Sequence, residues 1–575
     1  MIVKMRHLDL VCVASEREAT LEKLRELGAV HLGLETAAGA AVAAAKGDIA
    51  DAERAVRLVR KARGKGGEPG YRERSVQEIL AIEEDLETLC AEKDRLEREI
   101  RVYSPYGDFD PALARKLRER GVALRLSADG GFDFATDAGA APGEVAWPEM
   151  RLSRMQEKLA RVENRIAICT TKLADCDEGF VLSKFPQLAD RMAFEQAKEL
   201  LADHGAVSVV SGWIPATRES ELMEIVTKSK GDLFERANSL AWGVLLRDPA
   251  EGEIPPTLVE PPKLFRPMKV LFDGLGIAPA YTEADVSVPF MCYFSLFFAM
   301  LVGDGAYGAI FLAATLALCR KLPRSWFTLL TVFSSATIVW GLLSNTWFGA
   351  GIPACADWPT VQWLADPSYR HMMLLCFTIG VSHLMLARIW NGVCRLPDST
   401  AVAEFGWAGV LLFMYLVTNS IVGIFPSIPQ WAFWMFGAAL VCVFGFSVKP
   451  SELKTRGAEL GMLPLNIMSA LGDIISYVRL FAVGLASVKV AENFNSMATG
   501  LVAGVDALWL KALMAVAMVA ILVVGHGLNL AMAGLSILVH AVRLNTLEFS
   551  NHKGVSWSGY AFRPFSRAPS RGGQG

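Results

Sequence analysis

The chain has 575 residues, 52% of them hydrophobic, and its 57 Lys and Arg residues nearly balance its 60 Asp and Glu residues, giving a formal net charge of −3. This charge says little about partners, but the sequence has no basic stripe interleaved with aromatic residues, so nucleic-acid binding is set aside. Residues 1–265 are rich in Glu, Lys, Arg and Ala, whereas residues 289–549 are mostly apolar runs of membrane length. The composition predicts one domain in water and one in lipid.

The N-terminal apolar stretch is too short for a signal peptide, which predicts that residues 1–265 stay in the cytoplasm. Ten scattered cysteines without a CxxC pair indicate free thiols in a reducing compartment. No GxxxxGKS or GxxxxGKT loop is present, and the G-x-G-x-x-G run at residues 303–308 lies in membrane sequence with no βαβ unit around it. We therefore expect no ATP site, no metal site and no cofactor on this chain.

Alternating and helical patterns predict an α+β fold for the cytoplasmic domain. Residues 7–33 have the pattern of a strand, an amphipathic helix ending at Gly28 and a second strand. Residues 206–228 repeat a strand, a turn and a helix. These segments predict a small α/β lobe built from residues 1–35 together with residues 200–265.

Two heptad stretches, near residues 75–105 and 150–178, separate the parts of this lobe. Their heptad positions follow a 3-4 spacing, with one lysine among apolar residues: Ile79, Ile82, Leu86, Leu89, Lys93, Leu96 and Ile100, then Leu152, Met155, Leu159, Val162, Ile166, Cys169 and Leu173. Each stretch has one narrow apolar seam on a charged helix, which is typical of a coiled coil. We predict an antiparallel coiled-coil hairpin that carries a second small lobe near residues 106–149. Two amphipathic helices packed on a globular core are the alternative.

A linker at residues 266–288 leads to an all-α membrane domain at residues 289–549, and a basic tail follows at residues 550–575. The apolar runs are 289–319, 326–349, 370–390, 405–425, 429–447, 462–499 and 508–546. Basic loops alternate with neutral or acidic ones, and the positive-inside rule places the basic loops and the tail in the cytoplasm.

Eight spans follow from this orientation if the first run crosses twice. A cytoplasmic N-terminal domain and a cytoplasmic loop at residues 320–324 require an even number of crossings, so we expect two helices broken at residues 303–305. Each half would be ~22 Å long against a core of ~30 Å, and a hairpin that crosses only part of the bilayer is the alternative. The last two runs far exceed the ~20 residues of one crossing, which predicts steeply tilted helices.

Arg479 lies inside a long apolar run, residues 462–486. An arginine at bilayer depth costs at least a few kcal/mol, so its presence indicates a task for the charge. Helical spacing surrounds it with small residues, which permit close approach of another helix: Gly472, Ser476, Ala482, Val483 and Ala486. No acid on this helix shares that face, since Asp473 lies ~120° away. We expect no in-chain ion pair along this helix and a carboxylate of another polypeptide as the partner.

The last helix has a polar stripe formed by Asn529, Ser536, His540 and Arg543. In lipid, such a stripe lines water or another subunit. For Arg543 the alternative is a side chain that snorkels to the interface, and for His540 it is a satisfied polar neighbour.

Further polar residues are candidates for two aqueous half-channels. Asp473 and Ser476 lie toward the predicted cytoplasmic end of the seventh run, and Glu492 lies toward the other end, where with Lys489 it would otherwise only mark the far interface. Three weaker candidates are Asp304, which a turn would also explain, Asn345 and His383.

The segment SYVRLFAVGLAS (476–487) resembles the signature of subunit a, or subunit I, the membrane-embedded subunit of V-type and A-type rotary ATPases, in its prokaryotic form. The resemblance extends over the whole chain and includes the segments 211–222, 255–276, 289–308, 341–349 and 540–551. It implies that Arg479 works against the carboxylates of a proteolipid ring (c/K ring), that Arg543 assists, and that two half-channels carry H⁺ or Na⁺. At Ala533 the eukaryotic relatives have a glutamate, so the route here is expected to use His540 and Asn529, or Glu492.

The same resemblance implies the setting of the chain. The ion flow would be coupled to ATP hydrolysis or synthesis on other subunits, with the cytoplasmic domain as a stator arm in contact with peripheral-stalk subunits of the E and G/H type. A central-stalk subunit of the d/C type would lie nearby, and the membrane would be a bacterial or archaeal plasma membrane.

Two other classes compete with this interpretation. The first is a stand-alone secondary ion transporter with a cytoplasmic regulatory domain. Many such transporters consist of two repeated halves, and the membrane domain here shows no obvious repeat. The second is a membrane sensor, which needs no arginine at mid-bilayer. The rotary interpretation depends on Arg479: its burial against an acid of its own chain, or its exposure among the headgroups, would contradict it.

Overall fold

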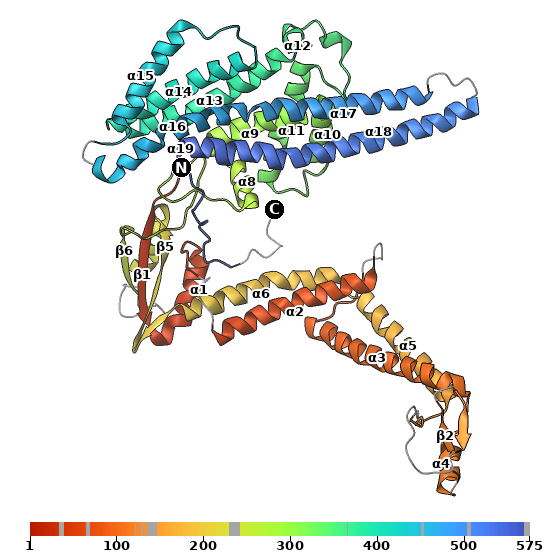
Figure 1. Cartoon of the computed structure of the whole chain (residues 1–575). Coiled ribbons are helices and arrows are strands. Elements are labelled where there is room, and N and C mark those ends of the chain that lie inside the picture. The colour runs from red at the N-terminus through yellow and green to blue at the C-terminus, as the bar shows by residue number, and fades with distance from the viewer. Residues whose placement is uncertain are drawn as a thin grey trace. The chain divides into compact units, whose positions relative to one another are not determined.

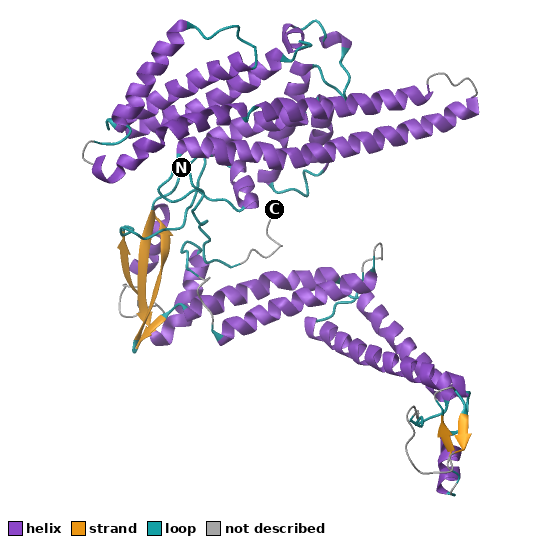
Figure 2. Cartoon of the chain, viewed as in Figure 1, coloured by secondary structure: helices purple, strands orange, loops and turns teal. Residues whose placement is uncertain are grey.

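The computed structural model describes residues 1–33, 39–64, 70–120, 122, 124–127, 130–134, 146–228, 242–364, 366–449, 453–502 and 508–567. The predictions for residues 135–145 of the distal lobe and for residues 568–575 of the tail lie outside this part. The described residues are mostly helical, with two small sheets (Figures 1 and 2). They divide into two compact units: an apolar unit of residues 1–5, 215–217 and 249–562, and a charged unit of residues 6–214, 218–248 and 563–575.

The larger sheet of the charged unit has the order β4-β5-β1-β6. Its strands are β4 (Ala202–His204), β5 (Val207–Pro215), β1 (Met5–Val13) and β6 (Trp242–Arg247), with the helices α1 (Arg17–Leu27) and α7 (Glu219–Lys228) beside them in the chain. Strand β1 buries Leu8, Leu10 and Cys12 on one face, as its alternating pattern predicts. The second strand expected before residue 33 is reduced to a single bridge between His31 and Trp213.

Two pairs of long helices make up most of the charged unit. Helix α3 (Val76–Tyr103) packs along α5 (Leu152–Ala174), and α2 (Ala40–Arg63) packs along α6 (Glu178–Glu199). Leu89, Leu96 and Val162 form the core between α3 and α5. The α2–α6 pair was not predicted, because α2 is rich in alanine and shows no strict heptad. Beyond α3 follow α4 (Pro111–Glu119) and the two-stranded sheet of β2 (Leu124–Leu126) and β3 (Phe132–Phe134) (Figure 1).

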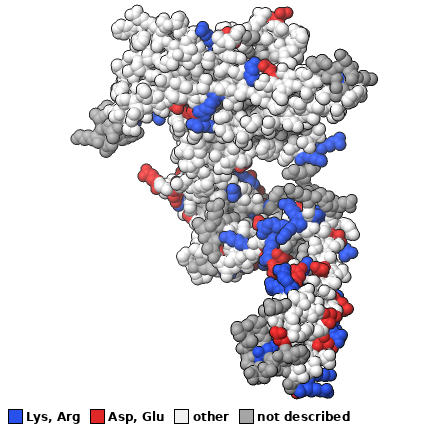
Figure 3. All heavy atoms as spheres, turned by 45° about the vertical axis from the view of Figure 1, so that its right-hand side comes forward, with Lys and Arg blue, Asp and Glu red and all other residues white. Residues whose placement is uncertain are grey.

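The apolar unit is a bundle of helices that contains the predicted membrane runs. Its helices are α8 (Pro267–Leu275), α9 (Ser287–Val302), α10 (Gly305–Ala317), α11 (Arg324–Ser344), α12 (Pro359–Leu364), α13 (Arg370–Arg395), α14 (Thr400–Ile421), α15 (Gln430–Phe446), α16 (Leu453–Ile475), α17 (Val478–Val502), α18 (Leu508–Ser536) and α19 (Ser550–Lys553). In Figure 3, Lys, Arg, Asp and Glu are sparse on the visible face of this unit and dense on that of the other. The chain is thus an integral membrane protein.

The eight predicted spans are not confirmed. Among the described residues, five helices are long and apolar enough to cross a membrane, or six if α9 and α10 form one broken span. Helices α9 and α10 are separated at residues 303–304, where the chain was expected to break, and they meet at a bend of 118°. Each is shorter than a crossing requires, as is α15 with 17 residues.

Irregular turns interrupt both of the last two runs. The seventh run is divided between α16 and α17 at Ser476–Tyr477, although its two parts together remain one candidate span, Leu460–Leu501. The eighth continues beyond α18 through two π-helical turns, Ile537–Ala541 and Leu544–Phe549, into α19. A π turn shifts every following side chain around the helix axis, so the 3.6-residue spacing used for the polar stripe fails there.

Glycines allow α9 and α17 to pack closely. A Cβ atom added at Gly484 would lie 2.4 Å from the carbonyl oxygen of Met300, and one added at Gly303 would lie 3.2 Å from the carbonyl oxygen of Gly484. By contrast, a Cβ atom at Gly472 on α16 would meet nothing within 4 Å. Of these two glycines of the seventh run, Gly484 therefore serves close helix packing and Gly472 does not.

We predict that Gly484→Ala destabilises the protein by about 1–3 kcal/mol, because the added methyl group forces α9 and α17 apart. Gly472→Ala is the matched control and should be neutral or stabilising by up to about 1 kcal/mol, since alanine is the better helix former. Thermal unfolding of both variants in one detergent tests this. Equal melting temperatures would contradict the tight packing at Gly484.

Candidate functional site

Arg479 is positioned by the interruption between α16 and α17. Two residues before it, the fully buried Tyr477 pairs through its hydroxyl with Nδ1 of His383 at 2.8 Å. The imidazole of His383 is itself stacked between Tyr293 and Phe549. The buried tyrosine anchors the turn, so the guanidinium two residues later leaves the helix from a fixed backbone. The side chain of Arg479 is 26% exposed.

An acid of the same chain lies beside Arg479, so the expectation that its partner is a carboxylate of another polypeptide is wrong for this structure. Because the Arg479 side chain remains 26% exposed, it contacts that acid without being buried against it. Glu548 Oε1 is 3.4 Å from Nη2 of Arg479 and 3.5 Å from Nε of Arg543. The glutamate is buried, with 6% of its side chain exposed, while that of Arg543 is 53% exposed. The site therefore contains two guanidinium groups and one carboxylate.

Glu548 was not predicted, for two reasons. It lies on another helix than Arg479, 69 positions later in the chain, where helical spacing around Arg479 gives no information. On an α-helix, Glu548 would also point about 140° away from Arg543, five residues earlier. The π turn at Leu544–Phe549 brings positions i and i+5 together instead. The only sequence signal was an acid just after an arginine at the end of an apolar run.

The predicted polar stripe of the last helix is divided by the structure. Ser536 and His540 are half-buried and Arg543 is exposed, but Asn529 is 2% exposed and faces the inside of the bundle. His540 lies within electrostatic range of both arginines. Asn529 therefore does not line an outer surface together with the others.

Asn529 belongs to a buried hydrogen-bond network between α10, α17 and α18. Its Nδ2 donates to the Tyr307 hydroxyl and to the Ser487 carbonyl, and its Oδ1 accepts from Ser487 Oγ. The Tyr307 hydroxyl pairs with His526 Nδ1 at 2.7 Å, and His526 Nε2 pairs with Asn495 Oδ1 at 3.1 Å. Since an amide oxygen only accepts, His526 carries its proton on Nε2 and accepts from the tyrosine. His526 and Tyr307 were not predicted.

Asp473 belongs to a second polar network, at the end of the bundle formed by α13, α16 and α19. Arg388 Nε donates to His552 Nδ1 at 3.1 Å, so His552 carries its proton on Nε2 and donates it to Asp473 Oδ2 at 3.0 Å. Arg388 also contacts Glu404 at 3.1 Å, and Glu404 contacts Arg395 at 2.9 Å.

These residues line a mostly polar cavity of about 510 Å³, together with Asn466, Ser469 and Asn551. Of its charged and imidazole groups, only Asp473 was predicted. Ser476 is not among its lining residues, and its hydroxyl donates to the Asp473 carbonyl at 2.7 Å.

Glu492 lines a different and smaller cavity, of about 240 Å³, with Gly303, Thr346 and Gly484. Its carboxylate pairs with Lys489 at 2.7 Å, three residues earlier on α17, and its side chain is 40% exposed. The ion pair with Lys489 agrees with the alternative that Glu492 only marks the membrane interface. The cavity agrees with the prediction that Glu492 lies at the mouth of a half-channel.

The three weaker candidates have structural roles. Asp304 is the N-cap of α10, since its Oδ1 accepts from the Ala306 amide and its Oδ2 accepts from the Gly349 amide, both at 2.8 Å. Asn345 closes a turn through two hydrogen bonds with the Ile352 backbone. His383 is fully buried among aromatic rings.

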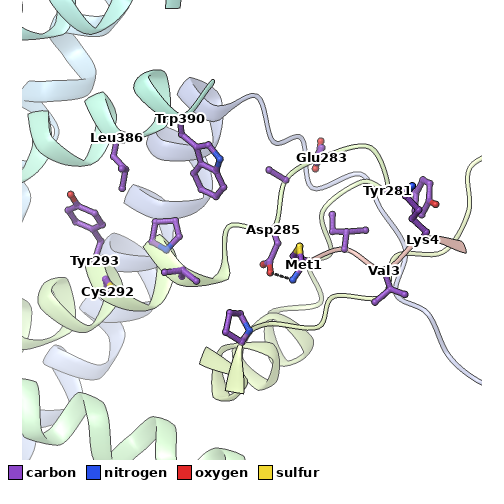
Figure 4. A pocket seen from close by; sticks show the side chains of 15 residues that line it. Met1, Val3, Lys4, Tyr281, Glu283, Asp285, Cys292, Tyr293, Leu386 and Trp390 are labelled. Carbon is purple, nitrogen blue, oxygen red and sulfur yellow. Dashed lines mark hydrogen bonds and ion pairs between the residues drawn. The ribbon is translucent and has the colours of Figure 1, made fainter. Parts of the chain in front are cut away.

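A further cavity, of about 870 Å³, contains none of the predicted site residues. It is mostly apolar and lies between the N-terminal residues, the linker and the helices α9 and α13 (Figure 4). The Met1 ammonium donates to Asp285 Oδ2 at its edge, at 2.7 Å. Within the described part of the chain, no cluster of three or more His, Cys, Asp or Glu residues could hold a metal ion.

Comparison with known proteins gives a consistent set of relatives. No family model matches the chain. V-type ATP synthase subunit I of Borreliella burgdorferi is 31% identical over 397 residues, which are 65% of this chain and 62% of that protein, so less than two thirds of that relative is covered. V-type ATP synthase subunit I 1 of Treponema pallidum is 27% identical over 98% of this chain and 100% of its own length. A-type ATP synthase subunit I of Methanocaldococcus jannaschii is 23% identical over 73% of this chain and 64% of its own.

We predict that Asn529→Ala lowers the free energy of unfolding by about 1–3 kcal/mol, because buried groups of Ser487 and Tyr307 lose their partners. Asn493→Ala is the matched control, since Asn493 is exposed on α17, and it should have almost no effect. Thermal unfolding in detergent measures both. A loss at Asn493 as large as that at Asn529 would refute the structural role of the network.

Proposed function

We propose that this chain, a member of the subunit a/I family of V-type and A-type rotary ATPases, is the stator subunit that conducts ions past a rotating ring of proteolipid carboxylates. The ion is H⁺ or Na⁺, and its flow is coupled to ATP hydrolysis or synthesis on other subunits. The observation that supports this most directly is Arg479, a partly exposed guanidinium in an apolar bundle.

The contact with Glu548 does not remove the positive charge of the site. One carboxylate lies between two guanidinium groups, so one unit of positive charge remains available to an approaching acid. Neither arginine is fully buried. A fixed positive charge favours the ionised form of a nearby carboxylate, and poor screening in lipid strengthens this effect. A ring carboxylate that reaches the site would therefore release its ion.

The two cavities fit two half-channels with separate openings. We assign the polar cavity at Asp473, His552 and Arg388 to the cytoplasmic side, where the positive-inside rule puts the neighbouring basic loops. We assign the cavity at Glu492 to the opposite side, since Glu492 follows Arg479 by 13 residues, or about 20 Å along α17. The positive charge between them would prevent ions from passing directly.

The charged unit fits a stator arm. Its paired helices α2–α6 and α3–α5 give it length and stiffness, and its surface is suited to other soluble subunits. We propose that it lies in the cytoplasm of a bacterial or archaeal cell and binds peripheral-stalk subunits of the E and G/H type. A central-stalk subunit of the d/C type would be close, and this chain itself would bind no ATP.

We predict that Arg479→Ala lowers ATP-driven ion uptake by about 100-fold or more, which corresponds to the loss of a stabilising interaction of ~3 kcal/mol. Arg479→Lys should retain more uptake, because it keeps the charge but not the planar donor group. The measurement is ion uptake by proteoliposomes that contain the whole complex, with the amount of assembled complex as a control. Normal uptake by a fully assembled Arg479→Ala complex would refute the proposed function.

We further predict that Asp473→Asn lowers uptake at least about tenfold, because water alone replaces a proton-accepting carboxylate poorly. The matched control is Asp357→Asn, at an exposed acid of the loop between α11 and α13, which should have no effect. If Asp473→Asn transports like the control, the cavity at Asp473 is not the ion route.

A further inference from the structure

Glu548 is a buried acid that the proposed mechanism uses only to count the charge of the site. It lies in the apolar unit on a π-helical turn with 6% of its side chain exposed. A carboxylate in such surroundings is costly unless its charge is compensated. Its Oε1 contacts both arginines, whereas its Oε2 has no hydrogen-bond partner among the residues that the structure describes.

The shared oxygen keeps the two arginines close together. Since Nη2 of Arg479 and Nε of Arg543 lie 3.4 Å and 3.5 Å from Oε1, these two nitrogens are within about 7 Å of each other. This is shorter than the screening length of physiological salt, and the surroundings are apolar, so the guanidinium groups repel each other strongly. The carboxylate between them offsets that repulsion.

The contacts are also longer than a tight pair requires. A charge-assisted hydrogen bond between a guanidinium and a carboxylate is usually about 2.7–2.9 Å long, well below the distances found here. A guanidinium has five N–H donors, so one shared carboxylate cannot occupy all the donors of two arginines. Glu548 holds both arginines near one place without saturating either of them.

We propose that Glu548 is a positioning residue that sets the net charge of this site to +1 and holds Arg479 and Arg543 as one unit. An approaching carboxylate competes with Glu548 for the guanidinium of Arg479, and Glu548 takes the guanidinium back when that carboxylate leaves. Capture and release of the passing acid are both possible because neither acid holds the arginine alone. This inference rests on the proposed function.

The proposal predicts how charge changes combine. Glu548→Gln raises the charge of the site to +2, so a passing carboxylate is held too tightly. Arg543→Gln lowers the charge to zero, because Glu548 then neutralises Arg479. The double variant Arg543→Gln/Glu548→Gln returns the charge to +1. We expect each single variant to lose at least tenfold in ATP-driven ion uptake by the reconstituted complex, and the double variant to recover to within threefold of the wild type.

A purely structural role of Glu548 predicts the opposite order, since two lost side chains should be at least as harmful as one. A double variant that assembles normally but is no better than the worse single variant would overturn the proposal. This result is distinct from failure of the proposed function, which normal uptake by Arg479→Ala would show.

A second comparison covers the case in which Glu548→Gln does not assemble. Arg543 is half-exposed, so its replacement is tolerated more easily by the fold. Arg543→Lys keeps the charge at +1 and should stay within threefold of the wild type, whereas Arg543→Gln should lose at least tenfold. Equal losses in the two variants would also overturn the role of charge balance.

Discussion

Charge in an apolar bundle is the constraint on which this structure depends. A guanidinium group in such surroundings needs a counter-charge, and one buried glutamate, Glu548, supplies it to both Arg479 and Arg543. The same constraint explains why Arg388 and Arg395 share the buried Glu404. The exposed fractions of the two arginine pairs are similar, so the two sets differ in their surroundings. Arg388, Arg395 and Glu404 line the polar cavity at Asp473, whereas Arg479, Arg543 and Glu548 are not among its lining residues.

Interruptions of the helices place the polar groups of the site. The break at residues 303–304 turns Asp304 into a cap for α10, and the break at residues 476–477 directs Arg479 away from the buried Tyr477. The π turn at Leu544–Phe549 brings Glu548 next to Arg543. Backbone groups released by such interruptions need new partners in an apolar environment. Asp304 accepts from the freed Ala306 amide, and the Ser550 hydroxyl donates to the Asn545 carbonyl. The polar groups of the candidate site and the irregular backbone thus occur at the same positions.

Several features were accessible from sequence because they depend on local periodicity. The seam of α3 and α5, the break near Asp304 and the unusual position of Arg479 all follow from patterns within one helix or one loop. Partners that are distant in sequence were not accessible. Glu548 reaches Arg479 only because the end of the last helix packs beside α17. Likewise, the hydrogen-bonded chain of His552, Arg388 and Glu404 forms only where α13, α14 and α19 pack together.

The amino-acid sequence by itself determined that the chain has a charged part and an apolar part, that the apolar part is helical, and that an arginine lies inside it. Composition and periodicity suffice for this, because apolar surface favours leaving water whichever segment or lipid it then packs against. The tertiary structure alone decided how many apolar helices are long enough to cross, which side chains line the cavities, and which acid compensates Arg479. Those outcomes depend on distances between segments that are far apart in the chain, and a π turn or a kink of one residue changes them while the periodic pattern stays the same.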